Sequence, residues 1–429
     1  MPNRNQSTAQ PFAATVGWDW ADKKHDLWLR PADGTKPEHI VLPQTPEALH
    51  EWVAKLRERF QGRPVAICLE TSRGPVISAL LAYDFIVLFA INPKALKSYR
   101  AAFSVSGAKD DRSDAMLLEE YVRLHRDKLQ ALEPDTVLTR TLAGLVETRR
   151  QLVDERTRLV EQLHSVLKTY YPLADTILGE QMTKPMASDF LHRWPDLASL
   201  QKAKPQVLQS FFYKHNSRSH ETIQARLEAV AQAKALTTDP AIIGPARLRV
   251  SALSAMLKPL HKMIAQLDQQ IEKTMDQHPD AAIFRSLPGA GPCLAPRLLV
   301  AFGTNRERFR SATEVAQFYG IAPVVRQSGE SKTVHVRYRC PKFGRQSFHE
   351  NAGCALREDW AGCFHSQYKK KHRDRHHQAN RSLAFKLIRI YYACWKNRQT
   401  YDAGRYLRAL EKNGSPLHAA LQTQIKKSE

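Results

Sequence analysis

Four carboxylates in the first 114 residues of this 429-residue chain have the spacing of a metal-dependent site. Asp19 follows a short apolar run, and Glu70 follows a second one at residues 65–69. Asp111 and Asp114 lie three residues apart, so a helix there would place them on the same side. Carboxylates are the ligands that Mg²⁺, or Mn²⁺, takes together with water and phosphate oxygens. The pattern predicts phosphoryl transfer, in which one metal ion activates the attacking oxygen and another stabilises the leaving oxygen.

Spacing alone does not decide which aspartates form the pair. Asp110 and Asp114, four residues apart, would share a helix face as Asp111 and Asp114 do. Any one of these acids taken singly could be a solvated surface group, and Asp22 and Asp26 are expected to be surface residues near the first turn. The set is informative because two of its members follow apolar, strand-like runs.

Ser328 lies in a polar segment, Arg-Gln-Ser-Gly-Glu, at 326–330. A serine there is most often a turn residue, and a serine nucleophile needs activation, for which the spacing reveals no histidine–acid partner. Cations near it in the sequence could stabilise charge on a phosphoryl group under attack. The residues expected to contact nucleic acid are Lys109, Arg326, Lys332, Arg337, Arg339, Lys342 and Arg345.

The charge of the chain favours a polyanionic partner. It has 64 lysines and arginines against 43 acidic residues, a net charge of +21, and the segment 326–398 holds 17 basic and 5 acidic residues. Each phosphate that a protein neutralises releases condensed counterions. No apolar run of about 18 residues and no signal-peptide core are present, so no membrane partner is expected. The six cysteines form no C-x-x-C pair and are interpreted as reduced thiols.

The acids need a scaffold that brings strand ends and a helix start together. Residues 13–125 alternate between strand-like and helix-like patterns. The expected strands are 12–18, 26–30, 38–42, 65–69 and 85–91, and the expected helices are 46–60, 75–83 and one that begins near Asp111. This order is that of an RNase H-like (RuvC-like) nuclease fold.

The middle of the chain has a different period. Apolar residues recur every seven residues over 135–170, which predicts a coiled coil or a helical hairpin. A second long helix is expected over 246–277, with Pro259 as a kink or boundary. The two helices could pair with each other or with another protomer. The stripe of Leu145, Leu152 and Leu159 is expected to face a partner helix in a homo-oligomer, and residues 173–217 look less regular.

The pattern changes again at residue 286. Leu-Pro-Gly-Ala-Gly-Pro at 287–292 resembles the glycine hairpin of helix-hairpin-helix modules, whose backbone N–H groups approach DNA phosphates. An apolar helix is expected over 294–302, followed by a polar serine-containing loop and the basic stretch. Residues 399–429 are expected to form a helical tail.

These motifs together resemble the DEDD insertion-sequence transposases, described as bridge-RNA-guided recombinases, over about residues 13–400. The matching blocks are Val-Gly-Trp-Asp at 16–19, Leu-Glu-Thr-Ser-Arg-Gly at 69–74, Lys-Asp-Asp-Arg-Ser-Asp-Ala at 109–115, and the glycine hairpin through Gly-Ile-Ala-Pro at 320–323 to Gln-Ser-Gly at 327–329. The third block is similar to the family's Lys-Thr-Asp-x-x-Asp-Ala, which selects Asp111 over Asp110. Glu-Thr-Ser-Arg in place of Glu-x-Thr-Gly, and Gly-Glu rather than Gly-Gly after Ser328, depart from the family pattern but remove no catalytic atom.

The resemblance implies an α/β plus α protein with four parts. A RuvC-like DEDD catalytic domain is expected at 1–130, and a coiled-coil, helical oligomerisation region at 131–280. A mostly helical C-terminal transposase domain with the catalytic serine and a helix-hairpin-helix-like motif is expected at 281–400. Residues 401–429 form the helical tail.

The resemblance also implies RNA-guided, site-specific DNA recombination. Asp19, Glu70, Asp111 and Asp114 would hold the metal, Ser328 would be the nucleophile, and the acids of one protomer would meet the serine of another. The implied partners are donor and target DNA, a structured noncoding guide RNA and further copies of the chain, as a dimer or tetramer, in the bacterial cytoplasm at the nucleoid. The alternatives are a RuvC-like junction endonuclease with water as nucleophile and a non-catalytic nucleic-acid-binding scaffold.

Overall fold

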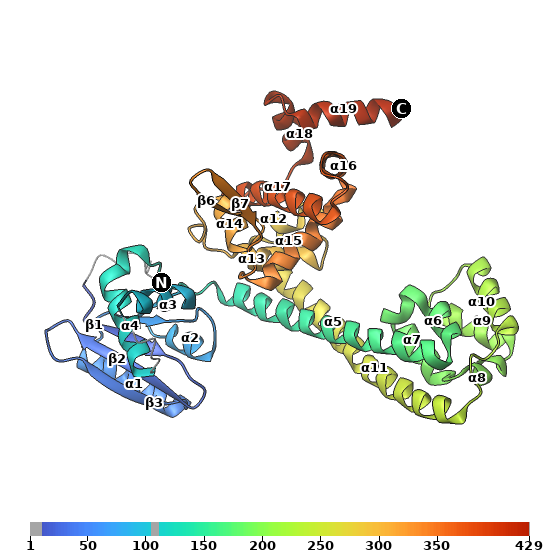
Figure 1. Cartoon of the computed structure of the whole chain (residues 1–429), viewed down its shortest axis with the longest axis horizontal. Helices are drawn as coiled ribbons and strands as arrows, with labels where there is room; N and C mark the ends of the chain where they lie inside the picture. Colours follow the sequence, from blue (N-terminus) through green and yellow to red (C-terminus); the bar gives the residue numbers. More distant parts are fainter. Residues whose placement is uncertain (1–10, 104–110, 429) are drawn as a thin grey trace. The chain divides into compact units, whose positions relative to one another are not determined.

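The computed structural model describes residues 11–103 and 111–428, and its contacts divide the chain into two compact units (Figure 1). Unit 1 is Met1–Pro134 and unit 2 is Asp135–Glu429. The domain boundaries expected at 130, 280 and 400 stay a prediction. Lys109 and Asp110 lie outside the described residues.

Unit 1 is built on a five-stranded mixed sheet in the order β3-β2-β1-β4-β5. β1 (Ala14–Asp19), β2 (Lys24–Pro31) and β3 (Glu38–Pro43) form an antiparallel meander, and β4 (Val65–Leu69) and β5 (Ile86–Ala90) continue parallel to β1. All five strands match predicted runs. Their order and directions are consistent with an RNase H-like fold.

Helices cover both faces of this sheet, and β4 is therefore buried along its whole length. The helices of unit 1 are α1 (Pro46–Arg59), α2 (Pro75–Leu80), α3 (Pro93–Phe103) and α4 (Asp111–His125). Trp18 packs with α1 residues in one apolar core, and Cys68 packs with α4 residues in another, on the opposite face. The sequence predicted α1, α2 and α4 but missed α3.

Helix α4 lies so close to β1 that there is no room for a side chain at Gly17. A Cβ atom built on Gly17 would stand 1.9 Å from the carbonyl oxygen of Ala115 and 2.4 Å from the backbone nitrogen of Glu119. Real Cβ atoms do not approach backbone atoms so closely, and backbone cannot rotate away as a side chain can. Gly17 is therefore the residue that lets α4 sit directly on the strand.

A buried carboxylate fixes the same helix to two strands. Glu119, fully buried on α4, accepts a hydrogen bond of 2.6 Å from the Thr15 hydroxyl on β1. It also accepts bonds of 3.1 Å from Arg30 on β2 and from Arg123 one turn further along α4. The two guanidinium groups offset the cost of burying the charge, because a buried charge is tolerated when it is paired and hydrogen-bonded.

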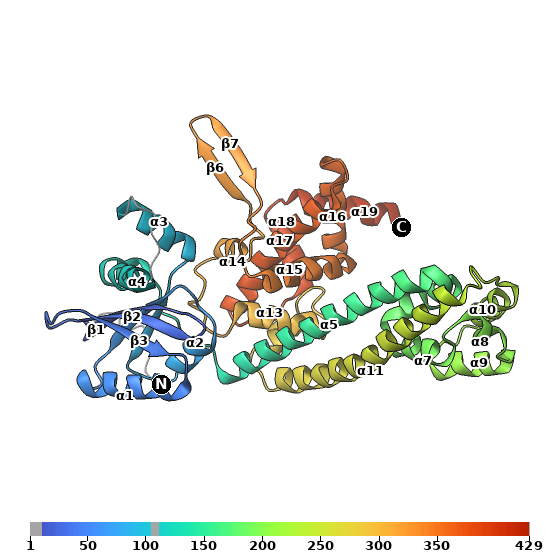
Figure 2. The same ribbon diagram turned by 60° about the horizontal axis from the view of Figure 1, so that its bottom comes forward.

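Two long antiparallel helices lie side by side in unit 2 (Figures 1 and 2). They are α5 (Val137–Tyr170) and α11 (Pro240–Asp276), and Arg149 and Asp268 form an ion pair between them. Both long helices were predicted, and the structure decides that they pair within one chain. Pro259 lies inside α11 and marks no boundary, contrary to that reading of the sequence. Coiled-coil packing stays a prediction.

Two leucines of the α5 stripe pack within the chain. Leu159 is 3% exposed in a core shared with Leu253 and Leu257 of α11, and Leu145, which is half-buried, packs against the C-terminal core. The expectation that the stripe faces a second protomer is therefore wrong at Leu159, because α11 covers it, and stays a prediction at Leu145 and at the half-buried Leu152.

The segment expected to be less regular forms a small helical lobe (Figure 1). Its elements are α6 (Pro172–Leu178), η3 (Gly179–Thr183), α7 (Pro185–Arg193), α8 (Leu197–Gln201), α9 (Pro205–Lys214) and α10 (His220–Gln232). Proline opens α6, α7 and α9, a position where its missing N–H costs nothing and its fixed φ suits a helix. The prolines therefore mark helix starts here, not irregular chain.

The C-terminal part of unit 2 packs helices around a large apolar core that contains Phe302, Phe348 and Trp395. Its elements are α12 (Ala281–Arg285), α13 (Leu294–Phe302), α14 (Ala312–Phe318), β6 (Val324–Ser328), β7 (Ser331–His335), α15 (Lys342–Cys354), η4 (Ala355–Arg357), α16 (Asp359–Lys371), α17 (His376–Lys396), α18 (Ala403–Lys412) and α19 (Pro416–Ser428). Helix α13 has the predicted bounds. No helix in the described residues is long and apolar enough to span a membrane.

The glycine turn before α13 packs against the rest of this core. Gly289 has φ 69°, and a Cβ there would lie 2.5 Å from the backbone nitrogen of Ala355. The Pro288 carbonyl accepts hydrogen bonds from the Asn351 amide and the Tyr391 hydroxyl. The turn therefore has a structural role, while its predicted contact with DNA phosphates stays a prediction.

The close contact between α4 and β1 yields the first prediction. Gly17→Ala should destabilise the protein by about 3 kcal/mol, near the upper end of ordinary overpacking costs, because only backbone can give way. The matched control is Gly144→Ala on α5, where a Cβ meets nothing within 4 Å and should stabilise the protein by about 0.5–1 kcal/mol. Chemical denaturation of both variants measures the difference. Equal stability of the two would show that α4 does not sit on Gly17.

Candidate active site

Asp19 and Glu70 leave neighbouring parallel strands at the same edge of the sheet. Asp19 is the last residue of β1, and Glu70 directly follows β4. The register pairs Trp18 with Leu69, so the two acids occupy adjacent positions one residue further on. Neighbouring strands lie about 4.8 Å apart, so Asp19 and Glu70 are neighbours at one edge of the sheet, and their role as metal ligands stays a prediction. Both residues are partly buried.

Both acids belong to the sheet face that α4 covers. Side chains alternate between the faces of a strand, so Asp19 shares a face with Gly17 and Thr15, which contact α4. Cys68, two residues before Glu70, packs with residues of α4 in the same way. The structure therefore brings the two strand-end acids to one side of the sheet.

The direction of α4 carries its first turn toward the same edge. Glu119 bonds to Thr15, and Ala115 lies against Gly17, so the helix runs opposite to β1. One further turn toward its start leads to Asp111 and Asp114, on the Asp19 side. Asp114 is 3% exposed, whereas Asp111 is exposed to solvent. The ends of β1 and β4 and the start of α4 thus supply carboxylates to one region.

Arg100, on α3, is a member of this region that the sequence did not reveal. Its guanidinium forms an ion pair with Asp114. An arginine in contact with a buried acid stabilises the charged form and fixes its orientation. Because α3 was not predicted from the sequence, Arg100 was not assigned a place near the acids.

Asp26 is buried, which corrects the expectation of a surface residue. It lies opposite Asp19 on β2, is 5% exposed, and its carboxylate is 2.7 Å from Nε2 of His39 and 3.8 Å from Nζ of Lys24. Directly opposed residues share a face of the sheet. Asp26 is therefore a further carboxylate beside the predicted set, and it contacts His39 and Lys24. It was misread because the strand begins at Lys24, earlier than predicted.

The Cys68 thiol, two residues before Glu70, is buried and uncharged. Burial raises the pKa of the Cys68 thiol to about 12, and the charge of Glu70 raises it further in the same direction. The thiol is therefore neutral at physiological pH and acts as a small apolar group. All six cysteines lie in the described residues and are free, as expected of reduced thiols.

The donor type of the acid set suits a hard divalent cation, since every member is a carboxylate. Within residues 11–103 and 111–428, however, no group of three or more His, Cys, Asp or Glu side chains is gathered as metal ligands. Part of the reason is that the Asp114 carboxylate faces Arg100. The fold thus brings the acids to one edge without assembling them into a finished coordination shell.

Ser328 ends strand β6 of an exposed hairpin, where the sequence predicted a polar loop. Figure 2 shows the hairpin extending away from the helices around it. Gly329 has φ 57° and opens the two-residue turn to Ser331, a conformation that favours glycine at that position. The alternation of the strand was missed because nearly all of its residues are exposed, so no apolar periodicity marks it.

The two faces of the hairpin differ. Ser328 and Ser331 pair directly, and Arg326 and Thr333 pair two residues away on the same face. Val325 and Val334 pair on the opposite face and are exposed. Ser328 is thus accessible, has a cation on its own face, and belongs to unit 2, whereas the acids belong to unit 1.

The predicted phosphate-binding cations around the hairpin fall into two groups. Arg337 donates to the backbone carbonyls of Gln317 and Arg339, and Arg345 donates to that of Arg337, so both brace the loop that follows β7. The cations exposed to solvent are Arg326, Lys332, Arg339 and Lys342. Only the second group is open to a phosphate backbone.

Comparisons with known proteins cover both units. A family model described as a transposase, of the IS110 DEDD type, matches residues 16–172. A second model, described as the transposase IS116/IS110/IS902 family, matches residues 281–369. The first match begins in β1 and includes all four predicted acids, and the second includes the glycine turn and Ser328.

Relatives match over nearly the full length. The protein named as the mini-circle transposase for IS117 of Streptomyces coelicolor is 27% identical over 400 residues, which are 91% of this chain and 95% of that protein. The 43.6 kDa protein of insertion element IS110 from the same organism is 24% identical, over 88% and 93% of the two chains. The 42 kDa protein of insertion element IS900 of Mycobacterium paratuberculosis is 26% identical, over 82% and 88%. With both family models matched in order, the chain belongs to the IS110 family of DEDD transposases.

Proposed function

We propose that this transposase is an RNA-guided, site-specific DNA recombinase that uses its acid set and a nucleophilic serine. A transposase acts on DNA, and the observation that carries the proposal further is the convergence of Asp19, Glu70 and the first turn of α4 on one edge of the sheet. Carboxylates from separate strand ends and a helix start suit phosphoryl transfer, in which positioning and charge stabilisation supply most of the catalysis.

In this proposal Asp19, Glu70, Asp111 and Asp114 would hold Mg²⁺ or Mn²⁺. The bound metal would supply Lewis-acid stabilisation of charge on the scissile phosphate. The chain itself contributes the fixed positions of the acids, through the contact of α4 with Gly17 and the bonds of Glu119. Arg100 would hold Asp114 in place.

Ser328 would attack the phosphorus of the scissile diester through Oγ. One P–O bond to DNA breaks as the serine–phosphate bond forms, the hydroxyl proton passes to a carboxylate base, and the departing DNA oxygen leaves as a hydroxyl. Attack of a hydroxyl from the other DNA partner on the serine–phosphate bond reverses these steps and rejoins the strands. The position of Ser328 at an exposed turn favours this role, because a nucleophile must reach a duplex from outside.

The acids and the serine lie in different compact units, and we propose a homo-oligomer, a dimer or tetramer, in which acids of one protomer meet the serine of another. A structured noncoding guide RNA would pair with donor and target DNA. The net charge of +21 supports a partner with many phosphates.

The acids give the second prediction. Asp19→Asn, Glu70→Gln, Asp111→Asn and Asp114→Asn should each lower DNA recombination on the order of 10²-fold or more, because each removes a negatively charged ligand of the metal ion that would stabilise charge on the scissile phosphate. The amides conserve shape, and unfolding measurements verify that each variant folds. Asp22→Asn, an exposed acid near the first turn, is the control and should keep full activity. Full activity of folded Asp111→Asn with inactive Asp110→Asn would show that the other aspartate belongs to the site.

The serine gives the third prediction. Incubation with DNA that cannot be rejoined should trap a denaturant-stable protein–DNA adduct, and mass spectrometry should map it to Ser328. Ser328→Ala should form no adduct, whereas Ser331→Ala, the exposed partner across the hairpin turn, should form it normally. Cleavage without an adduct in Ser328→Ala would identify water as the nucleophile and the protein as a junction endonuclease. An adduct at another residue would refute the assignment.

The charge gives the fourth prediction. RNA that copurifies with the protein should be one structured noncoding species when it is sequenced. Its affinity should fall on the order of 10³–10⁵-fold between 50 and 200 mM salt if about six to ten phosphates are contacted. A flat salt titration, or a random mixture of cellular RNA, would count against a guide RNA.

A further inference from the structure

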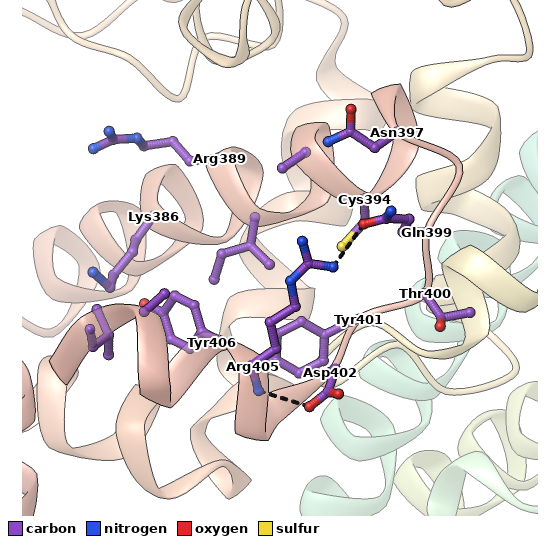
Figure 3. A pocket seen from close by; sticks show the side chains of 14 residues that line it. Lys386, Arg389, Cys394, Asn397, Gln399, Thr400, Tyr401, Asp402, Arg405 and Tyr406 are labelled. Atoms are coloured by element: carbon purple, nitrogen blue, oxygen red, sulfur yellow. Dashed lines mark hydrogen bonds between the residues drawn. The ribbon is translucent and has the colours of Figure 1, made fainter. Parts of the chain in front are cut away.

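A pocket of about 500 Å³ lies between α17, α18 and the segment that joins them (Figure 3). Lys386 and Arg389 line it from α17, and Arg405 reaches into it from α18. Its volume is in the range of sites that hold one small molecule or one nucleotide. None of these residues was among the predicted site residues.

The cations of this pocket lack acidic partners. Neither Lys386, Arg389 nor Arg405 forms an ion pair with an acid in the part of the chain that the structure describes. The single lining acid, Asp402, accepts a hydrogen bond of 2.9 Å from the backbone nitrogen of Arg405 and caps α18. The Arg405 guanidinium donates to Gln399 at 2.9 Å. The pocket therefore has a surplus of positive charge that the protein itself does not neutralise.

Lys386 is partly buried, and its ammonium lies near two aromatic rings. Its ammonium lies 5.5 Å from the ring centre of Phe364 and 6.0 Å from that of Tyr406. Burial, and after it the charge of Arg389, lowers the pKa of Lys386. An anion in the pocket would reverse both penalties, since it would restore the favourable electrostatics that burial removes.

Tyr406 and Tyr401 supply an aromatic wall to the pocket. The ring centre of Tyr406 lies 4.7 Å from that of Trp360 and 6.3 Å from that of Tyr401. The Tyr406 hydroxyl itself is buried, so the rings and not this hydroxyl are available to a ligand.

We infer that the α17–α18 pocket binds one nucleotide of a single-stranded nucleic acid, with its phosphate against Lys386, Arg389 and Arg405 and its base beside the rings of Tyr401 and Tyr406. Single strands are bound by cations that follow the backbone and by aromatic rings beside the bases. A pocket of this size admits an unstacked nucleotide, whereas a duplex presents none. The inference rests on the proposed function in that it gives the nucleic acid of that function a contact outside the catalytic residues.

The test uses the full-length protein and two labelled probes, a 12-nucleotide oligouridylate and a 12-nucleotide oligothymidylate, in fluorescence anisotropy. The double variant Arg389→Gln/Arg405→Gln should bind single strands about tenfold more weakly at 100 mM salt. Its salt dependence should fall by about 1.4 log units per log unit of salt, the value for two phosphate contacts on a single strand. Weakening with oligouridylate alone assigns the site to RNA, and weakening with both probes assigns it to either strand.

The matched control is Arg408→Gln/Lys412→Gln, which removes the same charge from exposed positions on α18 outside the pocket. It should change affinity less than twofold. Equal losses in the two double variants would show general charge attraction and overturn the inference. Unchanged binding in Arg389→Gln/Arg405→Gln would overturn it as well. A loss seen with a duplex DNA probe but not with the two single strands would have the same meaning.

Ser328→Ala should bind both probes normally, so loss of recombination chemistry and loss of this contact are separate results.

Discussion

The contact of α4 with β1 is the constraint on which the catalytic region of unit 1 depends. A helix normally packs about 10 Å from a sheet with side chains between them, but the absence of a Cβ at Gly17 brings the backbone of Ala115 and Glu119 onto the strand. That approach buries Glu119, which must then be paired, and Thr15, Arg30 and Arg123 pair it. The same approach sets how far the first turn of α4 extends along the strand. Contacts several residues away from these acids, at Gly17 and Glu119, therefore set the distance between the strand-end acids and the helix acids.

Much of unit 1 was predictable because its elements are buried on a regular period. The five strands and the helices α1, α2 and α4 each show an apolar pattern that only one kind of element satisfies. Helix α3 was missed because it begins at Pro93, and the pair Asn92-Pro93 reads as a turn. With α3 unseen, Arg100 could not be placed beside Asp114, and Asp26 could not be recognised as buried until the strand was known to begin at Lys24.

Unit 2 shows where local patterns are ambiguous. A seven-residue apolar repeat specifies that a helix is covered, but not by which chain, and only the fold reveals that α11 and the C-terminal helices cover α5. Proline gives opposite signals at different positions: it opens α6, α7 and α9 and lies inside α11. The hairpin that carries Ser328 has almost no buried residue, so its strands are stabilised by backbone pairing and turn geometry and leave no apolar signature.

Net charge, finally, is a weaker guide to nucleic-acid contacts than the pairing of each cation. Arg297 is buried and bonds to Glu350 and Ser347, and Arg337 and Arg345 are occupied by backbone carbonyls. These residues add to the positive total yet stabilise the fold, because each donates hydrogen bonds within the chain. Among the described residues, the cations of the α17–α18 pocket form no ion pair with an acid, and burial lowers the pKa of Lys386 although two aromatic rings lie beside its ammonium. A folded protein retains such a cost where a ligand repays it, so unpaired cations in a concave, aromatic setting locate phosphate binding better than the density of lysine and arginine along the sequence does.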